Sequence, residues 1–368
     1  MYEQIRGDIL FTILYAGVLF MALIASCYLL LRRGNAFAPD IIPPVRLRRW
    51  TGVYFAFIAL NHVWYLPILY LTSNDDILMI DLIGGMLDSM TVFPLSIVVL
   101  LSMLQDRRRP LWPIAVMTAP VTLGIAAFIA TRNKALYPWI YAYLLLMGLI
   151  LIIYMVHATR QYGRWLRDNY ADLEHKEVWQ SFIVLAIVLL VFVIYEFTSD
   201  GPVYIYAMLA VNAVLIVYLL WRVETLTDLS IAVKEAGEET SEDHAPAPNP
   251  QLSIRNSIGS LLEQYCEQPQ LYLQHDLTLS QLAQAIGTNR LYLSQYFSSR
   301  DMTYNAYING LRIQHFTNLY REALATHQAI SIRQLSCQSG FHSYSTFNAV
   351  FKQSMGMTAT EWMRTSES

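Results

Sequence analysis

The residues with the clearest chemical pattern lie near the C-terminus, where one short motif occurs twice. Residues 278–282 (TLSQL) are followed 53 positions later by residues 331–335 (SIRQL), and Gly287 and Gly340 follow the two copies at the same offset. A hydroxyl side chain three residues before a glutamine is typical of a capping box. In a capping box the hydroxyl accepts a hydrogen bond from the backbone N–H of the glutamine three residues later. The glutamine side chain accepts in return from the backbone N–H of the residue that carries the hydroxyl. The motif therefore predicts that a helix begins at each copy.

A second helix is predicted after each motif, because a glycine can end the first helix and Asn289 or Ser343 can cap the next one. The apolar residues expected on the buried side of these second helices are Leu293, Phe297, Phe347 and Phe351. Two helices joined by a tight turn form a helix-turn-helix. Its second helix, here called the probe helix, fits the major groove of DNA, where base edges are distinguishable.

Residues 303–324 can form the helix that joins the two copies. Their broad apolar stripe is made by Tyr304, Tyr307, Ile308, Leu311, Phe316, Leu319 and Ala323. Gly310 weakens this helix by about 1 kcal/mol. A joining helix can place both probe helices about one DNA turn apart, roughly 34 Å, on the same face of the duplex.

About the last 110 residues resemble the tandem helix-turn-helix domain of AraC/XylS-type bacterial transcription regulators. The matching positions are Leu282-Ala283, Gly287, Tyr292-Leu293-Ser294, Phe297, Tyr307-Ile308, Arg312-Ile313, Gly340-Phe341, Phe347, Phe351-Lys352 and Gly356-Met357-Thr358. Three features depart from the family pattern. The wing at 300–303 is one residue short and lacks its usual glycine, Phe316 replaces an alanine, and Ala359 replaces a proline. These departures leave the spacing of the probe helices open.

The resemblance implies that outward residues of the probe helices contact double-stranded promoter DNA, with RNA polymerase as a further partner. These residues are Arg290, Leu291, Ser294 and Gln295 in the first probe helix, and Tyr344, Ser345, Thr346, Asn348 and Ala349 in the second. Gln295 and Asn348 can pair bidentately with adenine, whereas Arg290 suits a phosphate or a guanine. The alternative is that these exposed side chains are only solvated.

The rest of the chain is strongly apolar. Of its 368 residues, 55% are hydrophobic and only 14% are charged. This composition is more apolar than that of soluble proteins. Apolar runs long enough to cross a bilayer of about 30 Å fall at 9–31, 50–72, 77–103, 111–130, 137–156, 179–197 and 203–221. We therefore expect an all-α protein. It comprises a seven-helix transmembrane sensor domain (1–222), a juxtamembrane helix with a flexible linker (223–251) and an AraC-type DNA-binding domain (252–368).

The loop charges predict an orientation in the bacterial inner (cytoplasmic) membrane. The loops 32–49, 104–110 and 157–178 carry twelve Lys and Arg residues, whereas the N-terminus and the alternate loops carry three. The positive-inside rule then places the N-terminus outside and the C-terminal domain in the cytoplasm.

Acidic side chains within the apolar runs are candidates for sensing. Asp81 and Asp88 are seven residues apart, hence on one helix face, and Gly84 and Gly85 between them allow a neighbour to approach closely. Ionisable groups at membrane depth are costly and indicate a cavity for a polar or cationic small molecule, a bound ion or a proton relay. The alternative is that Asp81 is wetted and Asp88 joins helices. Candidates to complete the pocket are Asn61, His62 and Asn212, each of which alone suits an interhelical hydrogen bond.

The connection predicts how a signal is transmitted. Leu226, Leu229, Val233 and Ala236 continue a 3-4 spacing that suits a short coiled coil in a homodimer. Residues 237–251 are acidic and contain prolines, which predicts a flexible tether. Residues 252–368 hold eight Lys and Arg against seven Asp and Glu, so one copy should bind DNA weakly and a pair more tightly.

Enzymatic chemistry is not indicated. The sequence has no nucleotide-binding loop, metal-ligand cluster or arranged nucleophile and base, and its three cysteines show no paired spacing. We therefore expect no cofactor, no metal and no catalytic residue. Two alternatives to a membrane-anchored regulator remain. One is a transporter or channel-like bundle whose tail is an interaction module, and the other is proteolytic release of the tail.

Overall fold

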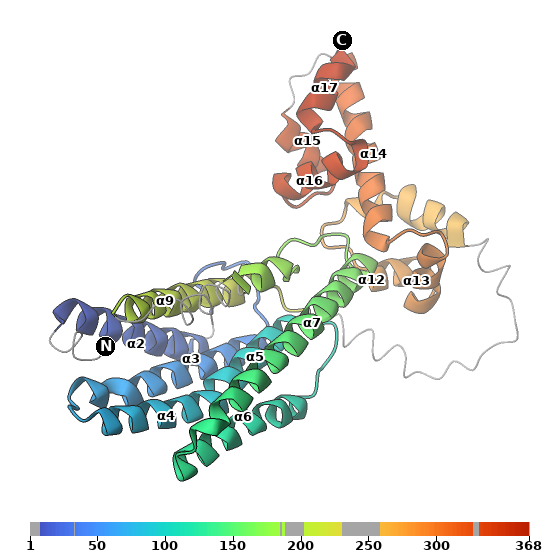
Figure 1. The fold of residues 1–368 in the computed structure, drawn as a ribbon. Coiled ribbons are helices and arrows are strands. Elements are labelled where there is room, and N and C mark those ends of the chain that lie inside the picture. Colours follow the sequence, from blue (N-terminus) through green and yellow to red (C-terminus); the bar gives the residue numbers. More distant parts are fainter. Residues whose placement is uncertain are drawn as a thin grey trace, which may run out of the picture. The chain divides into compact units, whose positions relative to one another are not determined.

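The computed structural model describes residues 8–32, 34–184, 186–187, 202–229, 258–326 and 331–367. Within these ranges every element is a helix, apart from an isolated antiparallel bridge between Tyr170 and Thr278, so the predicted all-α class is confirmed (Figure 1). Contacts divide the chain into two compact units. The N-terminal unit comprises Met1–Tyr162 and Val178–Ser230, and the C-terminal unit comprises Gly163–Glu177 and Ile231–Ser368. The sequence had assigned residues 163–177 to the first domain.

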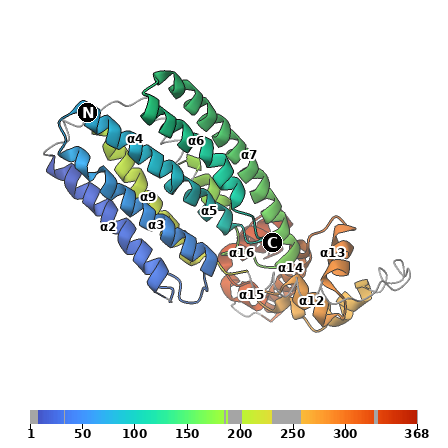
Figure 2. The same ribbon diagram turned by 90° about the horizontal axis from the view of Figure 1, so that it is seen from below.

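The N-terminal unit is a bundle of helices that lie lengthwise beside one another (Figure 2). Its elements are α2 (Ile9–Leu31), α3 (Val45–Tyr65), η1 (Leu66–Leu69), α4 (Asn74–Met90), α5 (Val92–Met103), α6 (Trp112–Thr131), η2 (Lys134–Leu136), the first part of α7 (Tyr137–Asn169) and α9 (Pro202–Thr225). Helix α3 lies against α2, α4, α5 and α9. It is therefore the helix around which this unit is packed.

Five helices in the described residues are long and apolar enough to cross a membrane: α2, Asp75–Met103, α6, α7 and α9. Their outward side chains are large and apolar, for example Ile24 (67% exposed) and Leu123 (68%), as lipid contact requires. Helix α3, which covers much of the predicted second segment, is not among the five. Most of the predicted sixth segment lies outside the described residues, so the count of seven stays a prediction.

The span Asp75–Met103, which includes the predicted third segment 77–103, is made by α4 and α5 end to end, and the two meet at Thr91. Pro94 has no N–H to donate to the carbonyl of Met90, which removes one hydrogen bond of a continuous helix. The Thr91 hydroxyl donates to the carbonyl of Leu87 (2.7 Å) at this junction. Two further prolines act differently on their helices: α3 ends at Tyr65 before Pro67, whereas α6 continues through Pro120.

The juxtamembrane coiled coil is not seen in the described residues. Helix α9 ends at Thr225, and Leu226 and Leu229 are buried within the N-terminal unit. The backbone N–H of Leu229 donates to the side chain of Gln105 (2.9 Å), and that of Asp228 donates to the carbonyl of Ile42 (2.9 Å). Bonds to loops have replaced the helical ones here, so neither leucine is available for a seam. The predicted tether lies outside the described residues.

A buried ion pair joins α3 to the end of α9. Arg48 lies 2.9 Å from Glu224, whose side chain is fully buried and also accepts a hydrogen bond from the hydroxyl of Tyr28 (3.0 Å). Removing one partner of such a pair leaves an uncompensated buried charge, which costs about 3–5 kcal/mol. The position from which the chain leaves α9 is thereby fixed.

The C-terminal unit contains the predicted helix pair twice. Helices α12 (Leu279–Ala285) and α13 (Arg290–Ser298) form the first pair, and α15 (Ile332–Gln338) and α16 (Tyr344–Met355) form the second. Helix α14 (Tyr304–Ala325) joins the pairs, and α17 (Ala359–Glu367) follows them. In Figure 1 the probe helices are α13 and α16. The tandem helix-turn-helix is therefore confirmed.

Each departure from the family pattern has a local solution in the structure. Asp301 takes the left-handed conformation (φ 51°) in the wing that lacks a glycine, which aspartate tolerates better than most residues. Phe316 is fully buried, with its ring centroid 4.6 Å from that of Phe347. Ala359 begins α17 and is also fully buried.

Candidate nucleic-acid interface and membrane polar cluster

The predicted caps fix where each probe helix begins. The side chain of Asn289 accepts from the N–H of Tyr292 (2.9 Å), and that of Ser343 accepts from the N–H of Thr346 (3.2 Å). The side chains expected to face the core are all buried: Leu293, Phe297, Phe347 and Phe351. Because these residues set the rotation of each probe helix, the other faces point outward.

The nine predicted DNA contacts lie on those outward faces to different degrees. The exposed members are Leu291, Gln295, Tyr344, Ser345 and Ala349. The half-buried members are Arg290, Ser294, Thr346 and Asn348. Tyr292, which is 45% exposed, was not among the predicted contacts although it lies on the same helix.

Two of the half-buried residues are bonded to the segment 163–177. Arg290 donates to the side-chain oxygen of Asn169 from Nε (3.0 Å) and from a terminal nitrogen (2.5 Å). The hydroxyl of Thr346 donates to a carboxylate oxygen of Glu174 (2.9 Å). The guanidinium of Arg290 and the hydroxyl of Thr346 are therefore already bonded to another part of the C-terminal unit.

The positive charge available to DNA is small. Arg312 is 1% exposed and donates to the carbonyls of Tyr272 and Gln274 (2.8 Å each), so it holds the joining helix to the preceding loop. Burial lowers the pKa of Arg312, and Tyr304, Asp172 and Asp276 act in the opposite direction. The exposed cations among the described residues of the unit's helical domain are Arg300, Arg321, Arg333, Lys352 and Arg364. Few phosphates can be neutralised by this set.

One group of described residues has the spacing of metal ligands. Asp172, Glu174 and His342 bring their ligand atoms within 4.8 Å of one another. The sequence could not indicate this group, because its members lie about 170 residues apart. The carboxylate of Glu174 already accepts the hydroxyl of Thr346, and the N–H of Glu174 donates to Asp172 (3.0 Å). These bonds account for the position of both carboxylates.

In the N-terminal unit, the structure brings Asp88 and Asn61 together. The Asn61 amide donates to one oxygen of Asp88 (2.6 Å), and the hydroxyl of Tyr65 donates to the other (3.0 Å). Tyr65 was not predicted. It approaches because Gly84 has no side chain, since a Cβ there would overlap the tyrosine ring. We call Asn61, Tyr65 and Asp88 the polar cluster.

The remaining sensing candidates bond elsewhere. The ring nitrogen Nδ1 of His62 lies 2.9 Å from the carbonyl of Ile58, and the amide of Asn212 donates to the carbonyl of Met208 (2.9 Å). Each of these bonds lies within the residue's own helix, whereas the sequence had suggested hydrogen bonds between helices. Asp81 lies seven residues before Asp88 on α4 and has interactions of its own.

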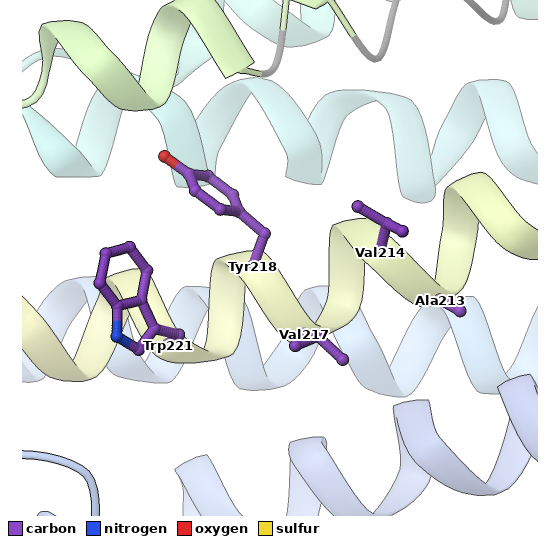
Figure 3. A pocket seen from close by; sticks show the side chains of 5 residues that line it. All are labelled: Ala213, Val214, Val217, Tyr218 and Trp221. Carbon is purple, nitrogen blue, oxygen red and sulfur yellow. The ribbon is translucent and has the colours of Figure 1, made fainter.

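A hollow along α9 has a different chemistry. It is lined almost entirely by apolar atoms of Ala213, Val214, Val217, Tyr218 and Trp221, which all project from that one helix (Figure 3). Sites for small polar molecules combine an apolar wall with several converging polar groups. The hollow lacks such groups, so it suits an acyl chain or an apolar side chain better.

Comparison with known proteins identifies the C-terminal region. Residues 282–365 match the family model described as "Helix-turn-helix domain". The TCP pilus virulence regulatory protein from two strains of Vibrio cholerae serotype O1 is 33% identical over 78 residues, which make up 21% of this chain and 26% of each relative. The chain thus spans about a quarter of the length of these curated relatives. No solved structure matches.

The family match and the two capped helix pairs identify the same kind of domain in the C-terminal region. It carries a DNA-binding helix-turn-helix domain of the AraC type found in transcription regulators. The resemblance given by the sequence is confirmed for this domain. The N-terminal helices lie outside the matched residues.

Proposed function

We propose that this chain is a membrane-anchored, one-component transcription regulator. The observation that carries the proposal is the pair of capped probe helices, α13 and α16, whose outward residues include Gln295 and Asn348. Both amides suit bidentate pairing with adenine in the major groove. The duplex would be read by the two probe helices together, and RNA polymerase would be recruited or excluded at the same promoter.

Anchoring is supported by the five apolar helices in the described part of the chain. We assign residues 1–222, apart from the segment 163–177 that belongs to the C-terminal unit, to an inner-membrane sensor domain with its N-terminus outside. Residues 252–368 form the cytoplasmic DNA-binding domain, and 223–251 connect the two. Full burial of each helix in lipid requires internal satisfaction of its polar groups, which the bonds of Asn61, Tyr65 and Asp88 provide.

The polar cluster is the proposed point of sensing. Asp88 accepts two hydrogen bonds in a region where an ionisable group is costly, so a cationic or polar small molecule that offers better partners would displace Asn61 or Tyr65. Asn61 and Tyr65 are on α3, the helix that packs against α2, α4, α5 and α9. Ligand binding would therefore shift the centre of the bundle. Homodimer formation would add avidity, because two tethered domains bind adjacent half-sites better than one.

The experiment is a genome-wide map of DNA crosslinked to the tagged full-length protein in its host. A Gln295→Ala/Asn348→Ala variant is the first comparison, and Asn61→Ala is the second. We expect discrete peaks upstream of a few genes that disappear in the probe-helix variant. In Asn61→Ala the peaks should remain but lose their response to growth conditions.

The transporter alternative predicts the reverse. Solute flux would depend on Asp81 or Asp88, and the probe-helix variant would be fully functional. Peaks that persist in Gln295→Ala/Asn348→Ala would contradict DNA reading by these helices. A soluble C-terminal fragment in cells would show that anchoring is only transient.

A further inference from the structure

A short stretch at the end of α7 is built into the DNA-binding unit, although the described helices of that unit resume only at residue 258. Ala171 is 1% exposed and belongs to the apolar core of the first helix pair, together with Leu279 and Ile308. Tyr170 and Asp172 are 4% and 5% exposed. We call residues 169–176 the docking segment.

The joining helix holds the backbone of the docking segment. The amide of Asn305 donates to the carbonyls of Tyr170 (3.1 Å) and Ala171 (2.7 Å), and that of Asn309 donates to Ala171 as well (3.2 Å). The N–H of Ala171 donates in turn to the carbonyl of Leu277 (3.3 Å). Recognition of the main chain at Tyr170 and Ala171 by two asparagines one helical turn apart makes this a shaped site rather than a loose contact.

The far end of the docking segment is held by charge. The ammonium of Lys176 lies 2.9 Å from the carboxylate of Asp276. Asp172 is buried, and its charge acts to raise the pKa of Arg312. Both ends and the centre of the docking segment are thus bonded to other residues of the C-terminal unit.

Two of the contacts involve the N-terminal turns of the probe helices, which are the parts that would enter the major groove of DNA. Arg290, the first residue of α13, is bonded to Asn169, and Thr346, in the first turn of α16, is bonded to Glu174. In helix-turn-helix proteins the N-terminal residues of the second helix contact the base edges. The Nε–H of Arg290 and the hydroxyl proton of Thr346 cannot be donated to the docking segment and to DNA at the same time.

The charge of the stretch adds to this exclusion. Residues 168–177 contain Asp168, Asp172, Glu174 and Glu177, against Lys176 as the one permanent cation. Of these carboxylates, that of Glu174 is bonded to a probe helix, and its charge repels a phosphate that approaches Thr346.

We infer that residues 169–176 are an internal competitor of DNA, docked on both probe helices, whose release switches DNA binding on. The inference rests on the proposed function. Asn169 is the last residue of α7, and α7 continues into the N-terminal unit. A shift of that helix would reach the docking segment directly. This route does not depend on residues 237–251, whose composition predicts a flexible tether that cannot transmit a small rotation.

Docking is tested without any knowledge of the DNA site. A carbodiimide, which joins a carboxylate to an amine without a spacer, is applied to full-length protein in host membranes. We expect an amide between Lys176 and Asp276, found by mass spectrometry of the digested protein. It should be absent in Lys176→Arg, which keeps the charge. Absence of the crosslink in the unmodified chain would overturn the inference.

Competition is tested with full-length protein in lipid nanodiscs and the duplex most enriched in the crosslinking map. Asn169→Ala frees Arg290, so DNA affinity should rise roughly tenfold. Asn169→Asp places a carboxylate on the same guanidinium, so affinity should fall. Both variants lose the Asn169 amide bond to the carbonyl of Trp165, hence opposite signs cannot come from a damaged helix end.

Glu174→Gln has a matched control. Glu177→Gln makes the same change of charge three residues further on, outside the contacts described above. We expect a rise of a few-fold in DNA affinity for Glu174→Gln and a clearly smaller one for Glu177→Gln. The Lys176–Asp276 crosslink should also decrease when the duplex is added. Equal affinities for Asn169→Ala, Asn169→Asp and the unmodified chain, or a crosslink unaffected by bound DNA, would overturn competition.

The two proposals fail differently. Discrete peaks in the crosslinking map with no effect of the docking-segment variants would contradict the inference alone. No peaks in either the unmodified chain or Asn169→Ala would contradict the regulator proposal, and competition with DNA along with it.

Discussion

The two halves of the DNA-binding unit share a plan but differ in what completes their cores. The first half, with α12 and α13, includes Ala171 from the docking segment among its buried residues. The core of the second half, with α15 and α16, draws on α14 and α17 and is largely aromatic, with Phe316, Phe347 and Phe351 in mutual ring contact. The first half is thus completed by a piece of chain attached to α7, one of the described helices that are long and apolar enough to cross a membrane. The same motif can therefore be self-contained in one copy and open to control in the other.

The largest expected loss of stability follows from a substitution in the aromatic core of the second half. Phe316→Ala should cost about 3–5 kcal/mol, because a fully buried ring with two ring neighbours is lost. Hydrogen exchange should show loss of protection in α15 and α16 before α12 and α13. Phe297→Ala is the matched variant in the first half and should reverse that order. Equal loss in both halves under either variant would show that they do not have separate cores.

The glycines of the two turns provide the next test. Gly340 has φ 86°, and a Cβ there would overlap the backbone of Leu273, whereas Gly287 has φ 70° with open space around it. Gly287→Ala should cost about 1–2 kcal/mol for its backbone conformation alone. Gly340→Ala should cost at least about 1–3 kcal/mol more, because the loop must move. Thermal unfolding of both variants measures the difference, and a smaller effect at Gly340 would contradict this packing.

The caps should differ by a smaller amount. Thr278 and Gln281 form the full reciprocal box, with bonds of 2.9 and 3.2 Å. In the second copy the described bond is the one from the N–H of Gln334 to Ser331 (3.2 Å). Thr278→Ala and Ser331→Ala should each cost about 1 kcal/mol. Gln281→Ala should cost a few tenths of that, and Gln334→Ala less still. Chemical denaturation of the four variants ranks them, and a larger cost at Gln334 would contradict the asymmetry.

A small effect on stability is also expected from the loss of the Asp276 carboxylate. Burial acts to raise the pKa of Asp276, but Lys176, aided by His342 and His275, outweighs it and holds the pKa below its usual 3.8. A lowered pKa means that the folded state gains stability above the unfolded pKa and loses it as the pH falls through the folded one. Because the side chain of Asp276 is 59% exposed, Asp276→Asn should cost less than about 1 kcal/mol. The difference in Tm from the unmodified chain should stay constant from neutral pH to about pH 5 and shrink in stronger acid. A difference that grows in acid would contradict this ion pair.

The helix pairs could be predicted from the sequence because their determinants are local. Thr278, Asn289 and Ser343 each cap a helix through a residue three positions ahead, and this spacing is visible in the chain itself. The same holds for the stripe of α14 and for the apolar lengths of α2, α6 and α9. For these elements hydrophobic periodicity and capping were sufficient.

The contacts that link distant parts could not be predicted in this way. Asn169 bonds to Arg290 across 121 residues, and nothing in the spacing of either residue indicates the other. Tyr65 reaches Asp88 because Gly84 leaves room, which requires knowledge of how α3 and α4 face each other. The break at Thr91 was missed because an apolar run does not show whether its helix is continuous. The seam expected at Leu226 and Leu229 was wrong because both residues are buried against loops.

The most direct test of paired reading by α13 and α16 is a hydroxyl-radical footprint of the full-length protein on the duplex most enriched in the crosslinking map. We predict two protected stretches about one helical turn apart, roughly 10 base pairs, on one face of the duplex. Gln295→Ala should remove or weaken one stretch, and Asn348→Ala should affect the other. A single protected stretch, or a footprint that neither variant alters, would contradict the reading of DNA by both probe helices.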